Sequence, residues 1–260
     1  MLKLGTSQTA DRLRRSKLRV PVFKWRHRGL TPADVMLASY PRSGNTWSKF
    51  MLAELLTGSE VDFSSNEDLV PMVGCHLGVP RLLPDAGRLI KTHEPYNRSY
   101  GRAIYLVRDV RDVALSFRKL RAVEGFDHES FEAFLIKFVR GEVGGYGSWQ
   151  AHVMSWLTAA QRDSGVLVIH YEELIDDTVT KLGEMARFLR VSDDEARLRA
   201  IVENNRPDKM RNRKTEYSDE RMSVTVGEGA YNRWRAHYSE AELALIEPAM
   251  ETMRLAGYIV

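Results

Sequence analysis

The sequence is short of cysteine and of long apolar runs. Among 260 residues Cys75 is the only cysteine, so neither an internal disulfide nor a cluster of thiolate metal ligands can form, and we expect a reducing, cytoplasmic location. The richest apolar stretches, 35–39 and 166–169, fall far short of the roughly 20 residues that a membrane-spanning helix requires. The composition also excludes collagen and coiled-coil architectures and is typical of a globular domain.

Basic and acidic residues nearly balance over the whole chain, but the basic excess is concentrated at its start. Residues 1–30 hold nine lysines and arginines against Asp11, a net charge of +8 compared with +3 for the chain, so the remaining residues carry −5. Two interpretations of this basic arm stay open: a solvated segment that covers the domain edge, which we favour, and an anchor for anionic lipid or nucleic acid. We therefore predict an arm at 1–30 and one domain at 31–260, with peripheral membrane contact of the arm as an alternative and no nucleic-acid partner.

Short apolar runs alternate with segments of helical periodicity through most of the chain. Strands are predicted at 35–39, 88–93, 103–107 and 166–169, and helices at 47–57, 113–120, 131–138, 149–157 and 174–189. Nearly unbroken apolar strands separated by helices are typical of a parallel sheet that helices cover on both faces. The expected fold class is therefore α/β, a single domain around a central parallel sheet.

The segment 204–229 departs from this alternation. It combines charge clusters, glycines at Gly227 and Gly229 and no clear period, so we predict a long loop of the kind that often acts as a lid. We expect residues 213–231 to be mobile without ligand and to order over a bound one. A final amphipathic helix is predicted to begin with Ser239 as its N-cap.

One strand-to-helix connection has the properties of a phosphate-binding loop. The segment from Tyr40 to Trp47 reads Tyr-Pro-Arg-Ser-Gly-Asn-Thr-Trp. Its Gly44 lets the backbone approach a ligand at a helix N-terminus, where amide groups and the helix dipole favour an anion. The nucleoside-triphosphatase pattern G-x-x-x-x-G-K-[ST] does not occur in it. Such connections also occur without a ligand, so this loop alone does not establish binding.

Polar residues also follow the other predicted strands. Lys91 and His93 end the second strand, Arg108 follows the third, and Tyr171 lies just after the fourth. Each has a purely structural alternative, such as a core histidine or an arginine that pairs with Asp112. Because ligands of parallel α/β sheets bind at the carboxyl ends of the strands, we expect these groups to share one anion-binding cleft with the loop.

Six blocks in the same order resemble a known family. The loop resembles the Y-P-K-S-G-T-T-W phosphosulfate-binding loop of cytosolic sulfotransferases that use 3′-phosphoadenosine 5′-phosphosulfate (PAPS), and 91–93 resembles their K-T-H segment. Residues 105–117 are similar to their 3′-phosphate motif, with its Arg and Ser eight positions apart, and 145–156, 171–174 and 234–239 are similar to later blocks. The resemblance runs from about residue 35 to the end, and it implies PAPS as the sulfuryl donor and no metal.

The resemblance also implies roles for individual residues. His93 is the expected general base, and Lys91 and Arg42 are expected to stabilise the transferred group and the bridging oxygen. Arg108 and Ser116 are expected to bind the 3′-phosphate. The full set of expected donor-binding residues is Arg42, Ser43, Gly44, Asn45, Thr46, Trp47, Arg108, Ser116, Tyr171 and Gly229.

The resemblance leaves the acceptor open beyond a hydroxyl-bearing small molecule. We expect its pocket to be built from the segments between the blocks, 63–84, 126–146 and 213–231. These segments supply Phe63, Met72, His76, Phe126, Tyr217 and Met222. Trp47 is expected to stack on one face of the adenine ring. A residue of 205–210 is expected to cover the opposite face of that ring, and Pro207 is the one candidate there.

The chain departs from the family pattern near the expected 3′-phosphate. The family's R-K-G aligns with Gly227-Glu228-Gly229, so a carboxylate replaces a cation there. Arg233 is one expected substitute, and a cluster of basic residues is the other: Arg211, Arg213 and Lys214.

The chain also differs from the family in its loop and in its dimerisation segment, and two other functions are compatible with the sequence. The loop has Arg42 and Asn45 where most members have Lys and Thr. The family's dimerisation segment is not kept, so no oligomeric state is inherited. Two other functions stay possible: a nucleotide or small-molecule kinase, which the missing P-loop lysine disfavours, and a nucleotide-binding protein without turnover.

Overall fold

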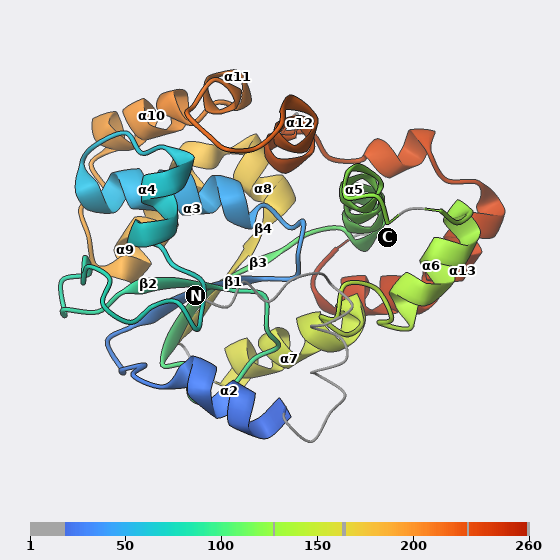
Figure 1. Ribbon diagram of the computed structural model, residues 1–260, viewed down its shortest axis with the longest axis horizontal. Helices are drawn as coiled ribbons and strands as arrows, with labels where there is room; N and C mark the ends of the chain where they lie inside the picture. Colours follow the sequence, from blue (N-terminus) through green and yellow to red (C-terminus); the bar gives the residue numbers. More distant parts are fainter. Residues whose placement is uncertain (1–18, 127, 163–164, 228, 259–260) are drawn as a thin grey trace.

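A parallel sheet of four strands forms the centre of the protein (Figure 1). The computed structural model describes residues 19–126, 128–162, 165–227 and 229–258. The strands are β1 (Val35–Ser39), β2 (Leu89–Thr92), β3 (Arg102–Val107) and β4 (Val166–His170), in the spatial order β2-β1-β3-β4. In the register, Val35 lies opposite Leu89 on one side and Arg102 on the other. The predicted α/β fold with a central parallel sheet is confirmed.

Helices occupy most of the remaining chain. They are α2 (Arg19–His27), α3 (Asn45–Thr57), α4 (Phe63–Leu69), α5 (Val110–Val123), α6 (Phe131–Val139), α7 (Trp149–Arg162), α8 (Tyr171–Asp176), α9 (Thr178–Leu189), α10 (Glu195–Asn204), α11 (Pro207–Arg211), α12 (Asp219–Val226), the short 3₁₀ helix η1 (Arg233–Ala236) and α13 (Glu240–Leu255).

Two apolar layers pack against the two faces of the sheet. Alternate residues of β1 divide between them, because successive side chains of a strand point to opposite faces. Met36 and Ala38 join the layer that contains residues of α5, α6, α7 and α13, whereas Val35 and Leu37 join the layer that contains residues of α3, α9 and α10. All five β1 residues are buried. This double coverage explains why the strands are almost continuously apolar in sequence.

The predicted helix at 174–189 is two helices. α8 ends at Asp176 and α9 begins at Thr178, and Asp177 between them accepts a hydrogen bond from the amide of Thr180. An aspartate in this position caps the second helix and redirects the chain. Apolar periodicity alone does not reveal such a break, since both helices present apolar residues to the same layer.

The predicted loop at 204–229 was wrong in part, since it contains α11 and α12. Pro207 occupies the first turn of α11, and Ser218 caps α12 by accepting a hydrogen bond from the amide of Arg221. Both are sequence signals for a helix start, and Met222 anchors α12 in the interior with 4% of its surface exposed. The predicted cap of the last helix is confirmed, because Ser239 and Glu242 form a capping box.

The described part of the basic arm is helical. In α2, Arg26 and His27 lie 3.2 and 3.0 Å from the carboxylate of Glu94. The basic residues before position 19 lie outside the described residues, and the division at residue 30 stays a prediction. Among the residues that the structure describes, no helix has the length and apolarity that crossing a bilayer requires.

Candidate functional site

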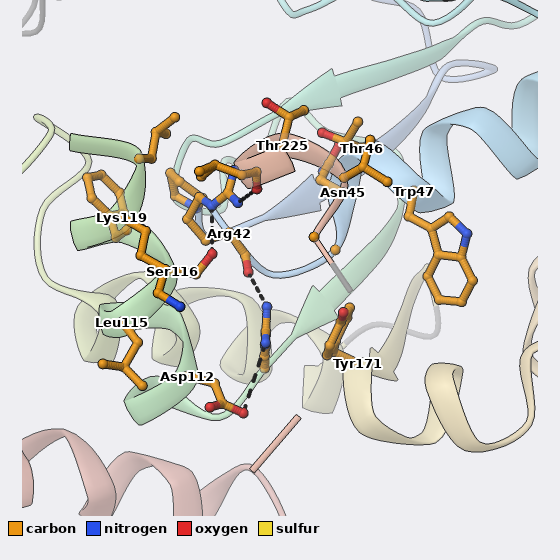
Figure 2. Close-up of a pocket in the computed structure, with 18 of the residues that line it drawn as sticks. Arg42, Asn45, Thr46, Trp47, Asp112, Leu115, Ser116, Lys119, Tyr171 and Thr225 are labelled. Carbon is orange, nitrogen blue, oxygen red and sulfur yellow. Dashed lines mark hydrogen bonds and ion pairs between the residues drawn. The ribbon is translucent and has the colours of Figure 1, made fainter. Parts of the chain in front are cut away.

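A cavity of about 1190 Å³ opens at the carboxyl edge of the sheet. The predicted site residues that line it are Arg42, Gly44, Asn45, Thr46, Trp47, Lys91, His93, Arg108, Ser116, Tyr171 and Gly229. Ser43 is buried and does not line it. Side chains from β2, from the ends of β1, β3 and β4 and from α5 therefore meet in one place, as Figure 2 shows for Arg42, Ser116 and Tyr171.

The turn between β1 and α3 depends on one close approach. Gly44 has φ of 88°, and a Cβ atom built on it lies 2.5 Å from the Tyr171 ring. Arg42 also has a positive φ, 75°, a conformation that costs a non-glycine residue of the order of 1 kcal/mol or more. A strained backbone conformation persists only where the surrounding structure holds the residue in it. The conformation of this turn is therefore fixed by its neighbours in the fold.

Buried polar atoms without a partner gather around this turn. Ser43 Oγ, Asn45 Oδ1 and Ser48 Oγ have no hydrogen-bond partner in the described structure. The amide nitrogen of Asn45 donates instead to the carbonyl of Leu37 and to Ser39 Oγ, both at 3.2 Å. Buried polar groups are seldom left unpaired. Of these three residues, Asn45 lines the cavity, whereas the hydroxyls of Ser43 and Ser48 are buried behind its wall.

Arg42 connects the turn with two other elements. Its Nε donates to Ser116 Oγ of α5 at 2.9 Å, and its Nη2 donates to the carbonyl of Val224 in α12. Burial, and secondarily the nearby charge of Arg108, lower the pKa of Arg42 to about 10. Arg42 therefore remains cationic at neutral pH, and its side chain lines the cavity.

Lys91 and His93 face the cavity from the end of β2. Burial, followed by the neighbouring charge of Lys49, lowers the pKa of Lys91 to about 8. Burial and then the charge of Lys91 lower the pKa of His93 to about 3. The pair thus comprises a cation near its titration point and a neutral imidazole.

The tautomer of His93 follows from its hydrogen bonds. Nδ1 lies 2.8 Å from the carbonyl oxygen of Ser39, which can only accept, so Nδ1 carries the proton. The ring meets Tyr146 edge-on at 5.9 Å between centroids. Nε2 of the neutral ring is then left with its lone pair, as a general base requires.

Arg108 follows β3 directly and also lines the cavity. It donates to the carbonyls of Arg42 at 3.1 Å and Ala230 at 3.2 Å, and its guanidinium lies 4.2 Å above the centroid of the Tyr171 ring. Asp112 Oδ2 is 3.9 Å away, and Arg108 Nε is buried without a partner. Figure 2 marks the contact with Asp112 by a dashed line.

Asp112 holds one end of segment 205–234, called here the covering segment, which supplies many of the residues that line the cavity. Its two carboxylate oxygens accept from the amides of Asn232 at 2.7 Å and Trp234 at 3.0 Å. Burial is the main cause that raises the pKa of Asp112, and the charge of Arg108 opposes it. Asp112 was considered in the sequence only as a partner for Arg108, so its role at the covering segment was missed.

Asn205 holds the other end of that segment. Its carbonyl accepts from Trp47 Nε1 at 2.8 Å, and its side-chain nitrogen donates to Glu54 of α3 at 2.6 Å. Arg213 donates to Asn205 Oδ1 at 3.1 Å. The first residue after α10 is therefore tied to α3, the helix that follows the turn at Gly44.

The wall near Trp47 is apolar. Pro207 and Met210 of α11 line the cavity together with Trp47. Of these, the sequence suggested Trp47 and Pro207 as the two faces of a ring-binding slot. Met210 belongs to the same predicted segment, but nothing in its pattern separates it from an ordinary core residue.

The predicted acceptor segments contribute only some of their residues. Met72, Phe126 and Tyr217 line the cavity. The others do not: Phe63 packs on Phe50 and Tyr217, His76 is hydrogen-bonded to the carbonyl of Arg28 and the amide of Gly74, and Met222 is buried under α12. Sequence position alone could not separate the two groups, since all six are large and lie between motifs.

The basic cluster expected to substitute for the missing cations is not at the cavity. Arg211 donates to the carbonyl of Gly227, and Arg213 is buried between Glu54 and Glu60 at 3.9 and 3.3 Å. Arg233, the other expected substitute, does line the cavity. Glu228 lies outside the described residues.

The site and fold define a class of protein, an α/β domain with an anion-binding cavity at the carboxyl ends of its strands. Comparisons with known proteins give the family. The model of the sulfotransferase domain matches residues 32–252, and the chain belongs to this sulfotransferase family. The kinase alternative receives no support from these matches.

Individual relatives agree with this assignment. Human sulfotransferase 1E1 is 28% identical over 237 residues, which cover 81% of this chain and 80% of that protein. Mouse sulfotransferase 1B1 is 31% identical over 191 residues, 66% of this chain and 63% of that protein. The structure of mouse sulfotransferase SULT7A1 complexed with PAP aligns with a TM-score of 0.70 and 24% identity over 89% of this chain and 88% of that one.

Proposed function

We propose that this protein transfers a sulfuryl group from PAPS to a hydroxyl of a small-molecule acceptor. The observation that carries the proposal is the neutral His93 with a free Nε2 in the same cavity as the cations Lys91 and Arg42. Relatives whose structures contain PAP support the donor, and one of them, a retinol dehydratase, was solved with androsterone as well. We further propose a cytoplasmic location.

The donor end of the cavity suits a nucleotide with two phosphate groups. The backbone amides of Ser43 and of the first residues of α3 are proposed to bind the 5′-phosphate, which the positive end of the helix dipole also favours. Arg108 and Ser116 are proposed to bind the 3′-phosphate by charge-assisted hydrogen bonds. Trp47 is proposed to stack on the adenine, with Pro207 opposite. PAPS supplies the activated sulfuryl group when it is bound.

The chemistry needs charge compensation on one side and a proton acceptor on the other. Sulfuryl transfer moves negative charge onto the leaving phosphate oxygen, so fixed cations near that oxygen lower the barrier. Lys91 and Arg42 are proposed to supply them. His93 Nε2 is proposed to accept the proton of the acceptor hydroxyl, while the Ser39 carbonyl holds the ring in the required tautomer.

The low pKa of His93 has a consequence for this role. A base with a pKa of about 3 is neutral throughout the physiological range, but it binds a proton weakly. An anionic donor in the cavity favours the protonated form and raises that pKa. We therefore expect His93 to become an effective base only after the donor has bound.

Within the described ranges, no group of three or more His, Cys, Asp or Glu side chains is arranged to hold a metal ion. The proposal assigns the neutralisation of charge to the cationic side chains named above. Whether added metal ions stimulate transfer is therefore a direct part of the test.

The test uses the purified protein with two donors. We expect transfer of labelled sulfate from PAPS to a panel of phenols, steroids and aliphatic alcohols, with and without a chelator, and no turnover of Mg²⁺-ATP. Calorimetry with adenosine 3′,5′-bisphosphate measures binding separately from turnover. Nucleotide binding without transfer to any acceptor would favour the non-catalytic alternative, and Mg²⁺-dependent use of ATP would favour the kinase.

A further inference from the structure

One cation, Arg42, already contacts Ser116, because its Nε donates to Ser116 Oγ at 2.9 Å. The proposed function assigns the charge of Arg42 to the bridging oxygen, so a phosphate group bound beside Ser116 needs further positive charge. At neutral pH a phosphate monoester carries a charge between −1.5 and −2. The loop that aligns with the family's R-K-G contributes Gly227 and Gly229 to the cavity wall, and neither has a side chain that could bind the group. Arg211 and Arg213 are engaged elsewhere. Compensation must come from other parts of the fold.

Arg108 alone does not supply that compensation. Its charge is partly offset by Asp112 at 3.9 Å, and two of its donors are used by the backbone carbonyls of Arg42 and Ala230. The pair of Arg108 and Asp112 is close to neutral as a unit. A doubly charged group next to it therefore calls for at least one more cation.

The first additional cation comes from α5. Asp112, Leu115, Ser116 and Lys119 all line the cavity, and their spacing of three, four and seven residues puts them on one side of the helix. Figure 2 shows the side chain of Lys119 extending along this side, with its ammonium end directed toward the cavity. Lys119 is therefore one turn from Ser116, within reach of the same ligand group.

The second additional cation comes from the segment that Asp112 holds. The amides of Asn232 and Trp234 both bond to the Asp112 carboxylate, and the residue between them is Arg233. Because both neighbours are hydrogen-bonded to Asp112, the backbone of Arg233 is held in position. The side chain of Arg233 lines the cavity. The clamp that Asp112 provides thus presents Arg233 beside the same turn of α5.

We propose that Lys119 and Arg233 together bind the 3′-phosphate of the donor, in place of the cations missing from the loop. The inference rests on the proposed function, because it assumes a 3′-phosphorylated nucleotide as the ligand. It assigns the discrimination between 3′-phosphorylated and unphosphorylated nucleotides to α5 and η1. Arg108 then shares the 3′-phosphate with them through Nε, which is buried without a partner, while its other donors hold the carbonyls of Arg42 and Ala230.

The test compares two nucleotides that differ in the 3′-phosphate alone. Dissociation constants for adenosine 3′,5′-bisphosphate and adenosine 5′-monophosphate are measured by calorimetry for the wild type, Lys119→Gln, Arg233→Gln and the double variant. We expect weaker bisphosphate binding by about 3- to 10-fold for the exposed Lys119 and by about 10-fold or more for Arg233. Binding of the monophosphate is expected to stay within about twofold.

Two further variants serve as controls. Lys119→Arg keeps the charge and is expected to retain most of the bisphosphate affinity. Lys137→Gln removes a charge from α6, where Lys137 pairs with Glu129 outside the cavity, and is expected to change neither constant. Thermal unfolding of each variant checks that the fold is intact.

The outcomes separate this inference from the function on which it rests. A wild type that binds neither nucleotide contradicts both. A wild type that prefers the bisphosphate, combined with variants that keep the full preference, overturns only the roles of Lys119 and Arg233. Equal weakening of both nucleotides assigns these residues to the shape of the cavity and also overturns the inference.

Discussion

The edge of the sheet and the segment that covers it are built in different ways. The turn between β1 and α3 is specified mainly by neighbouring residues: a buried strand, Gly44 and the first turn of α3. The segment 205–234 is instead held by contacts from distant parts of the chain. Arg42 reaches the carbonyl of Val224, 182 positions away, and Arg108 reaches that of Ala230, 122 positions away.

This difference explains how the two regions depend on each other. The side chains that hold the covering segment are among those that the proposed function assigns to the donor. Arg42 and Arg108 already donate to its backbone carbonyls. A donor that recruits these arginines competes with the covering segment, so binding of the nucleotide and the position of the segment are linked.

The largest effect is expected from removing the proposed base at the sheet edge. His93→Ala should lower turnover by about 10² or more, because general-base catalysis typically contributes 10²- to 10⁴-fold, with little change in donor affinity. Single-turnover transfer and calorimetry measure the two quantities. His237→Ala, at an exposed site outside the cavity, is the matched control. A variant that keeps more than half of the wild-type rate, with chemistry rate-limiting, removes His93 from the mechanism.

Arg108→Ala tests which region that arginine serves. If it binds the 3′-phosphate, affinity for adenosine 3′,5′-bisphosphate should fall by about 10-fold or more while that for the monophosphate changes little, since a charge-assisted hydrogen bond contributes about 1.5–3 kcal/mol. If it acts mainly on the covering segment, both nucleotides should weaken together and proteolysis within 213–231 should accelerate. The two readouts together discriminate the roles.

The pH dependence of donor binding probes Lys91. Its pKa of about 8 in the free protein means that the ammonium is lost as the pH rises through 8, so affinity for an anionic nucleotide should decline above that pH, by at most about tenfold per pH unit. Proton uptake on binding at pH 8.5, from calorimetry in buffers of different ionisation enthalpy, is the direct measurement. Lys91→Met should abolish the uptake that this residue causes, and an unchanged uptake would assign it to another group.

The smallest effect is expected from an exposed contact of the covering segment. Arg221 of α12 lies 3.5 Å from Glu124, and both side chains are partly exposed, at 44% and 30%. Exposed ion pairs contribute little, about 0–1 kcal/mol, so Arg221→Gln should accelerate donor dissociation by no more than about fivefold. Stopped-flow dissociation at low and high salt measures it. A larger effect would mean that the covering segment depends on this pair more than on its buried contacts.

The parts of the molecule that sequence predicts best are those fixed by local rules. The turn at Gly44 and the cap at Ser239 follow from backbone geometry within a few residues. The grouping of Lys91, His93 and Arg108 follows from the parallel order of the strands. Pro207 and Ser218 are sequence signals for helix starts, but the charge and glycine content of their segment favoured the prediction of a loop.

Other features could not be predicted because they depend on packing between distant elements. Arg213 has the same residue type as Arg233, but it is buried against Glu54, whereas Arg233 lines the cavity. Nothing in the local sequence separates the two. Lys119 lies at the correct helical spacing from Ser116, but a pocket-facing lysine and a solvated one look alike until the helix has been oriented.

The two attachments of the covering segment have a mechanical consequence. Asn205 fixes one end to α3 through Glu54, and Asp112 fixes the other end to α5 through the amides of Asn232 and Trp234. A segment held at both ends cannot swing aside as a hinged flap does, and between its ends Met222 is buried and the carbonyls of Val224 and Ala230 are hydrogen-bonded. We expect the breaking of these inner contacts to determine how bulky an acceptor can enter and how fast the spent nucleotide leaves.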